Sequence, residues 1–229
     1  MLTVGILGGM GPMATVDLFS KIIECTPVKF DQEHLKIIVY NNPQIPSRIK
    51  AIIDGTESPS EELIRSAQFL EKSGADILAM PCNTAHYWHQ DIQSVINVKL
   101  INMIEKTADY VSTQEANSKI MLFATAATIR TELYQKAFLA KNMSLLVPEP
   151  EEQKIISFAI EQAKAGKVED NSCLSPLGGI ISKYQKVGVT SFIAGCTEIP
   201  LLFKHIKRDF CQIDPTLLLA QEVVKQALM

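Results

Sequence analysis

The sequence predicts an α/β protein made of two similar lobes, each built on a mainly parallel sheet. Apolar β-rich runs alternate with helical patterns of ten or more residues, which is typical of βαβ units. The chain also contains an internal repeat: EKSGADILAMPC at 71–82 and YQKVGVTSFIAGC at 184–196 both indicate a helix end, a glycine, a buried strand and a cysteine. At 229 residues the chain can form two lobes of roughly 100 residues each. We expect the first lobe to span 1–103 plus 215–229 and the second to span 104–214.

The first lobe begins with a buried strand, TVGILG, followed by a GGMGP loop and a helix that Pro12 favours in its first turn. Two prolines in PQIPSR then predict an extended loop ending at Arg48, and Gly74 ends a helix whose apolar residues recur at helical spacing. We expect strands at 3–8, 35–42, 76–80 and 98–103, and helices at about 12–24, 60–73 and 83–96.

The pattern starts again after Ile104. A linking helix at 104–112 leads to the strand KIMLFAT, the counterpart of TVGILG. We expect the remaining strands at 119–125, 144–148, 190–195 and 211–214, and helices at 128–140, from PEPEE to Gly166, at 175–186 and from Pro215 onward. The last of these helices is expected to pack on the first lobe.

Composition excludes several classes of protein. The net charge is -3, with 47% hydrophobic and 21% charged residues, and no basic stripe or basic amphipathic helix indicates a nucleic acid or membrane partner. No apolar run reaches the roughly 18 residues of a membrane span, and Met1 leads directly into LTVGIL without a signal-peptide pattern. Five widely spaced cysteines without CxxC disfavour a disulfide framework or a zinc site. We therefore expect a cytoplasmic protein.

Several polar side chains follow strands at their carboxyl ends, where open α/β sheets bind ligands. We expect them to meet in one cleft between the lobes: the GGMGP loop, Asn42, Arg48, Cys82, Thr125 and Cys196.

Cys82 and Cys196 occupy the same strand-to-helix junction in the two copies of the repeat. A helix N-terminus can lower the pKa of a thiol from about 8.5 into the range ~3.5–7.5, so both cysteines are candidates for acid/base chemistry. One thiolate can remove a proton from a carbon while the other thiol returns a proton on the opposite face. Cys25, Cys173 and Cys211 are expected to be small buried residues without such a role.

The chain resembles the pyridoxal-independent aspartate/glutamate racemases, and within them the aspartate racemase branch. The matching segments occur in the family's order: GILGGMGPMAT, NNPQIPSR, MPCNTAH, FATAAT, EQAKAG and AGCTEIP. The resemblance implies that Cys82 and Cys196 are the catalytic acid/base pair and that Arg48 and Lys164 bind the substrate carboxylates. It also implies a homodimer, no cofactor and no metal, and further ligand contacts from Met10, Asn42, Asn83, Thr84, Thr125 and Thr197.

One departure bears on the substrate. Glutamate racemases typically carry a histidine two residues after the second cysteine and an Asp-Ser pair in the first loop. This chain has Glu198 and GGMGP instead, which favours aspartate over glutamate as the substrate. Glu198 could polarise the Cys196 site or simply begin the next helix.

Other functions stay open at the level of sequence. The enzyme could racemise glutamate or another amino acid, or could be a superfamily isomerase such as maleate isomerase. A two-lobed protein that only binds a small anion would have no use for two matched thiols. GGMGP lacks the GxGxxG and GKS/T patterns of phosphate loops, and Cys82 with His86, four residues apart, could be metal ligands but have no further partner.

Overall fold

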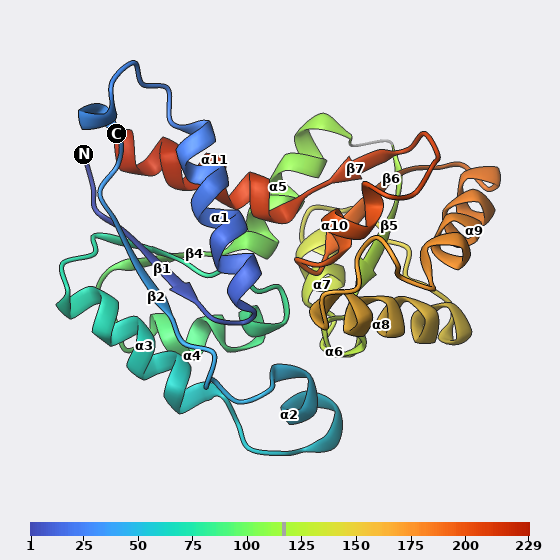
Figure 1. Ribbon diagram of the computed structural model, residues 1–229, viewed down its shortest axis with the longest axis horizontal. Helices are drawn as coiled ribbons and strands as arrows, with labels where there is room; N and C mark the ends of the chain where they lie inside the picture. Colours follow the sequence, from blue (N-terminus) through green and yellow to red (C-terminus); the bar gives the residue numbers. More distant parts are fainter. Residues whose placement is uncertain (116–117) are drawn as a thin grey trace. The chain divides into compact units, whose positions relative to one another are not determined.

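The computed structural model describes residues 1–115 and 118–229, and the chain divides into two compact units (Figure 1). The first unit consists of Met1–Lys106 with Thr216–Met229, and the second of Thr107–Pro215. Each unit contains a parallel sheet with helices packed on it, which confirms the predicted α/β class. Within the described ranges, no helix combines the length and the apolar character that a bilayer crossing needs.

The first unit is built on a four-stranded parallel sheet with the order β2-β1-β3-β4. Its central strand β1 is buried throughout, as expected when helices cover both faces of a parallel sheet. The strands are β1 (Val4–Gly8), β2 (Ile37–Asn41), β3 (Ile77–Ala79) and β4 (Lys99–Ile101).

Helices cover both faces of this sheet (Figure 1). Because side chains alternate along a strand, Ile6 packs in a core with α1 and α11, while its neighbour Leu7 packs in a core with α3 and α4. The placement of α11 against the first sheet agrees with the prediction for the last helix. The helices of this unit are α1 (Pro12–Cys25), η1 (Asp31–Glu33), α2 (Arg48–Asp54), α3 (Ser60–Lys72), η2 (Thr84–Trp88), α4 (His89–Gln93) and α11 (Pro215–Leu228). Helix α5 (Met103–Gln114) begins in the first unit, and most of its residues belong to the second.

The second unit is built on a three-stranded parallel sheet with the order β5-β6-β7. Phe123 and Phe192 meet edge to face at 5.7 Å in its core, which they share with apolar residues of α8 and α9. The elements are β5 (Lys119–Ala124), β6 (Val189–Gly195), β7 (Cys211–Ile213), α6 (Ala126–Arg130), α7 (Leu133–Leu139), α8 (Pro150–Lys164), α9 (Leu174–Lys186) and α10 (Ile199–Phe203).

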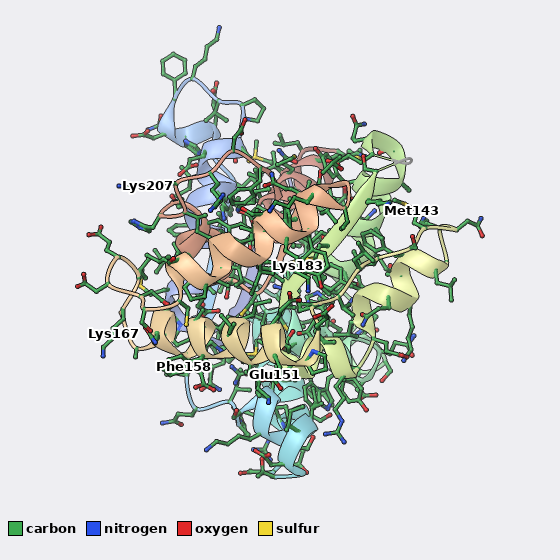
Figure 2. All side chains as sticks on the ribbon, turned by 90° about the vertical axis from the view of Figure 1, so that its right-hand side faces the viewer. Met143, Glu151, Phe158, Lys167, Lys183 and Lys207 are labelled. Carbon is green, nitrogen blue, oxygen red and sulfur yellow. The ribbon has the colours of Figure 1, made fainter. Side chains whose placement is uncertain are left out.

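Helices α8 and α9 run side by side and are joined by ion pairs (Figure 2). The Lys183 ammonium lies 2.9 Å from a carboxylate oxygen of Glu149 and 2.7 Å from one of Glu152. The Tyr184 hydroxyl donates to the other oxygen of Glu152 at 2.8 Å. These contacts anchor the start of α8, whose last residue is Lys164.

The predicted strand at 144–148 is wrong. Leu146 forms a single bridge to β5, in which its N–H donates to Ile120 and its carbonyl accepts from Leu122. The next N–H on the same side of that segment would belong to residue 148, which is a proline and has none. The ladder therefore stops after one residue.

Two predicted helices are interrupted. The helix expected at 128–140 is divided into α6 and α7 at Glu132, which has a left-handed backbone with φ of 56°. The helix expected after Cys82 is a 3-10 turn, η2, followed by the five-residue α4. Its tight first turn is linked to the contacts of His86 described below.

Candidate active site

Each unit places one cysteine at the carboxyl end of a strand that neighbours the unit's first strand. Cys196 directly follows β6, which pairs with β5, and Cys82 lies three residues beyond β3, which pairs with β1. Both side chains are buried, at 7% exposure for Cys82 and 6% for Cys196. The equivalence that the repeat predicted is therefore present in the folded units.

His86 holds the backbone of Cys82. Its Nδ1 lies 2.8 Å from the Cys82 carbonyl oxygen, and the Met103 N–H donates to its Nε2 at 3.1 Å. Because Nε2 accepts a bond, Nδ1 must carry the proton and donate to Cys82. Burial lowers the pKa of His86 to about 4, so the ring is neutral near pH 7.

The same contacts argue against a metal ligand at His86. Both ring nitrogens are hydrogen-bonded to backbone groups, and Nδ1 faces the carbonyl of Cys82 rather than presenting a lone pair to an ion. Across the described chain there is also no group of three or more His, Cys, Asp or Glu side chains that could hold a metal. His86 is thus a structural support of the Cys82 turn.

Cys196 contacts a carboxylate. Its Sγ lies 2.9 Å from Oε2 of Glu198, and the Thr197 hydroxyl donates to the same oxygen at 3.2 Å. Burial and the Glu198 charge raise the pKa of the Cys196 thiol well above its usual value, against an opposing effect from the Lys164 ammonium. The expected lowering of this pKa by a helix N-terminus is wrong, because α10 has five residues and the two raising effects dominate.

Three further candidate residues of the second unit are related to this thiol by the sheet, by the chain or by charge. Ala124 and Gly195 are paired in the sheet, so the residues that follow them, Thr125 and Cys196, leave adjacent strands at the same edge. The Thr125 hydroxyl caps α6 by accepting the Thr128 N–H at 3.1 Å. Thr125, Thr197 and Lys164 thus all belong to the neighbourhood of Cys196, the last through its charge.

The GGMGP loop is shaped by close backbone packing. A Cβ on Gly9, whose φ is +98°, would lie 2.2 Å from the carbonyl carbon of Asn42. The Gly9 N–H donates to the Thr15 hydroxyl at 2.9 Å, so this amide is already satisfied within the loop. Glycine is required here by the approach of two strand ends and not by a phosphate.

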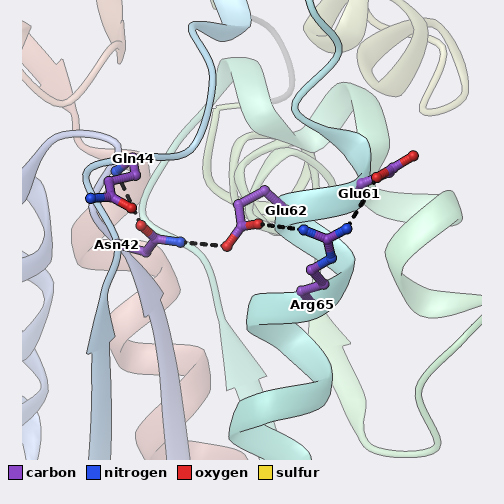
Figure 3. Close-up of polar contacts among 5 residues, drawn as sticks. All are labelled: Asn42, Gln44, Glu61, Glu62 and Arg65. Carbon is purple, nitrogen blue, oxygen red and sulfur yellow. Dashed lines mark hydrogen bonds and ion pairs between the residues drawn. The ribbon is translucent and has the colours of Figure 1, made fainter.

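Asn42, which follows β2, is held by helix α3 (Figure 3). Its Nδ2 donates to Glu62 at 2.8 Å, and its Oδ1 accepts the Gln44 N–H at 3.0 Å. Arg65 lies 3.4 Å from the other oxygen of Glu62 and 3.3 Å from Glu61. This network fixes the turn after β2 and borders a cavity of about 430 Å³ that is lined by Gln44, Pro46, Glu57, Ser58, Glu61, Glu62 and Arg65.

Arg48 begins helix α2 instead of ending a loop, because Ser47 provides an N-cap by accepting the Lys50 N–H at 3.3 Å. Its Nη1 donates to the carbonyls of Ile45 and Pro46 at 3.0 and 2.9 Å. Its Nε is buried with no hydrogen-bond partner in the described part of the chain. The guanidinium is thereby held in one orientation by the loop before it.

The other candidate residues of the first unit lie close to Cys82. Met10 packs in the same core as Cys82 and Ile45, and Asn83 and Thr84 follow the cysteine and are buried. Sequence reasoning gave no role to Glu62 and left the roles of His86 and Glu198 open. In the sequence, the signal for His86 was its position four residues after Cys82, and the signal for Glu198 was its position two residues after Cys196.

Comparisons with known proteins identify the family of the chain. A model of the Asp/Glu/Hydantoin racemase family matches residues 7–223. The broad specificity amino-acid racemase RacX of Bacillus subtilis is 26% identical over 230 residues, covering 98% of this chain and 98% of the relative.

Solved structures show the same similarity. The Picrophilus torridus aspartate racemase has a TM-score of 0.86 and 29% identity, covering 99% of this chain and 94% of that chain. An aspartate racemase homologue from Pyrococcus horikoshii has a TM-score of 0.79 and 26% identity over 100% of both chains. This protein therefore belongs to the Asp/Glu/Hydantoin racemase family.

Proposed function

We propose that this protein racemises aspartate without pyridoxal phosphate, and that Cys82 and Cys196 exchange protons with the α-carbon of the substrate. The observation that carries the proposal is the pair of buried cysteines, each at a strand end of its own unit. Family membership supports the reaction class, and the similarity to the aspartate racemase of Picrophilus torridus supports the substrate.

In the proposed reaction, the Cys82 thiolate takes the α-proton of one enantiomer. The electron pair of the broken C–H bond stays on the substrate as a carbanion delocalised into its carboxylate. The Cys196 thiol then donates its proton to the opposite face, which forms the other enantiomer and leaves a Cys196 thiolate. One proton leaves the carbon and one arrives, so no oxidant or further reactant is needed.

We assign the substrate's two carboxylates to Arg48 and Lys164. A guanidinium binds a carboxylate through two parallel N–H bonds, and the loop carbonyls that hold Nη1 of Arg48 fix its orientation. Lys164 supplies a point charge at the end of α8, where it already favours the Cys196 thiolate. A cation near the reacting carbon also stabilises the carbanion.

A second candidate is a racemase of broad specificity. The similarity to the broad specificity racemase of Bacillus subtilis over 98% of both chains favours it. The two candidates share the two-thiol reaction and differ in the substrates accepted, so a panel of amino acids distinguishes them.

The test is chiral chromatography of L- and D-aspartate, glutamate and neutral amino acids incubated with the purified protein and no cofactor. We expect interconversion of the aspartate enantiomers and a loss of at least about 100-fold in Cys82→Ser and in Cys196→Ser. Cys173→Ser, a buried cysteine outside both junctions, is the matched control. Racemisation that persists in both active-site variants would overturn the assignment.

We further propose that the protein is a homodimer, on the family resemblance. Light scattering should then give about twice the 25.3 kDa mass of the chain.

A further inference from the structure

We infer that Glu198 is a positioning residue that keeps Cys196 protonated in the resting protein and directs its S–H bond. This inference rests on the proposed function, because it assigns Cys196 the role of acid in the first proton exchange. The observation behind it is the 2.9 Å contact between Cys196 Sγ and Glu198 Oε2. An ionised carboxylate can only accept hydrogen bonds, so the thiol must be the donor.

The contact is part of a small, defined network. Oε2 of Glu198 accepts from the thiol and from the Thr197 hydroxyl, which donates at 3.2 Å. Glu198 also provides the N-cap position of α10, and the Ile199 N–H donates to the Cys196 carbonyl at 3.0 Å. The backbone turn and the side-chain contacts together fix the carboxylate beside the thiol.

Two charges act on the same sulfur, and two further titratable groups lie on neighbouring elements of the second unit. Glu198 opposes a thiolate at Cys196, and Lys164 at the end of α8 favours it. Tyr134 on α7 is fully buried, and burial raises its pKa, so this phenol stays neutral near pH 7. Asp214, which follows β7, raises the pKa of Tyr134, and so does the charge of Cys196. Glu198 and Lys164 are thus the opposing charges that set the state of Cys196.

This arrangement gives the two cysteines different starting roles. A two-thiol racemase needs one thiolate and one thiol at any moment. If Cys196 rests as the thiol, the enantiomer whose α-proton faces Cys82 reacts directly. The other enantiomer reacts only after Cys196 has lost its proton, and the resulting thiolate beside Glu198 is a strong base.

The decisive experiment measures the ionisation of Cys196 in the absence of substrate. The ultraviolet absorbance of thiolate is followed against pH in the full-length protein, and the same titration with Cys196→Ser is subtracted. Glu198→Gln removes the charge and preserves the shape, so the midpoint assigned to Cys196 should move to lower pH. Glu198→Asp keeps the charge and should return the midpoint toward that of the unchanged protein.

A variant that should shift the ionisation midpoint of Cys196 in the opposite direction keeps the inference testable if Glu198→Gln does not fold. Lys164→Gln removes the opposing charge and should move the same midpoint to higher pH. Circular dichroism confirms the fold of each variant. A midpoint that is unchanged in Glu198→Gln, or that moves in the same direction in Glu198→Gln and Lys164→Gln, would overturn the inference.

Activity provides a second and separable readout. The pH profile of kcat/KM reports groups of the free enzyme, so in Glu198→Gln the limb assigned to Cys196 should move to lower pH in both reaction directions. A shifted thiol midpoint without racemisation of any amino acid would contradict the proposed function and leave the state of Cys196 as inferred. Racemisation with an unshifted midpoint would contradict the role of Glu198 alone.

Discussion

At the scale of single residues, the two cysteines are supported in different ways. The Cys82 backbone is held by the neutral ring of His86, whereas the Cys196 side chain contacts the carboxylate of Glu198. The repeat in the sequence located both cysteines, because a strand ending in a cysteine is a local pattern. The supports differ because they depend on which side chains turn toward each cysteine, and that is decided by tertiary packing.

His86 should make the protein sensitive to mild acid. Its pKa of about 4 in the folded state lies below the ordinary value of 6.5, so the unfolded chain binds the proton first and stability falls as pH drops from 6.5 toward 4. The contribution lost over this window is roughly 3 kcal/mol.

The measurement is urea unfolding of the unchanged protein, His86→Asn and His86→Gln between pH 7 and pH 4. Neither variant titrates at this position, so both should lose less stability over the window than the unchanged protein does. Asn can keep the bond to the Cys82 carbonyl and Gln the acceptor for Met103. An equal acid loss in all three proteins would contradict the buried neutral ring.

Gly9 is the second position where one residue decides local structure. In Gly9→Ala the new methyl group would overlap the Asn42 backbone at 2.2 Å and the positive φ would be strained. We expect a loss of roughly 1–3 kcal/mol in the free energy of unfolding.

Gly11→Ala is the matched control, since a Cβ there meets nothing within 4 Å. Denaturant melts of the two variants make the comparison. Equal stabilities would show that the first loop and Asn42 do not approach each other closely.

At the scale of secondary-structure elements, helix α3 positions the turn that leads to Arg48. Glu62 accepts from Asn42, and Asn42 accepts from the Gln44 N–H (Figure 3). Glu62→Ala should therefore raise KM for the substrate and lower stability by about 1 kcal/mol, because the Nδ2 group of Asn42 loses its acceptor.

Glu61→Ala is the control on the same helix. Glu61 is exposed and pairs with Arg65 alone among the described contacts, so its removal should change KM little and stability by about 0.5 kcal/mol at most. Steady-state kinetics with both variants make the test. A raised KM in both, or in neither, would contradict a positioning role of Glu62.

The ion pairs between α8 and α9 predict that the stability of the protein depends on pH. Burial tends to raise the pKa of Glu152, but its bonds with Lys183, the Glu149 N–H and the Tyr184 hydroxyl outweigh this effect and lower it. Its contribution to stability is therefore present at neutral pH and is lost as pH falls through the carboxyl range.

Glu152→Gln should be less stable than the unchanged protein at pH 7, and the difference should shrink in acid. Glu151→Gln, an exposed residue paired with Lys154, is the control and should show a smaller difference at pH 7. Thermal melts against pH make the comparison. A difference for Glu152→Gln that grows in acid would contradict the lowered pKa.

The elements also show what sequence patterns can and cannot predict. Strands β1, β3 and β5 follow from continuous apolar runs, because a strand covered on both faces has no polar alternation. The edge strand β2 has no buried residue and was indicated by its β-rich composition. The segment around Leu146 has the same composition and forms one bridge, because Pro148 cannot continue the ladder. The break at Glu132 could not be predicted from the sequence either, since the periodicity of a helix does not show that a glutamate adopts a left-handed backbone.

At the scale of the whole molecule, the α/β class and the family resemblance predicted from the sequence are confirmed by the two parallel sheets and by the family match over residues 7–223. The substrate is a finer property. The side chains that we propose to bind it, such as Arg48 and Asn42, have partners that are supplied by packing and not by a local pattern.

The two-thiol reaction is tested most directly by following deuterium from the solvent during the conversion of L-aspartate in D₂O. Early in the reaction, we expect the D-aspartate formed to carry deuterium at the α-carbon while the remaining L-aspartate keeps its proton, because separate thiols serve the two faces. Deuterium appearing equally in both enantiomers, or a product that retains the original proton, would indicate a single base and rule out the two-thiol reaction.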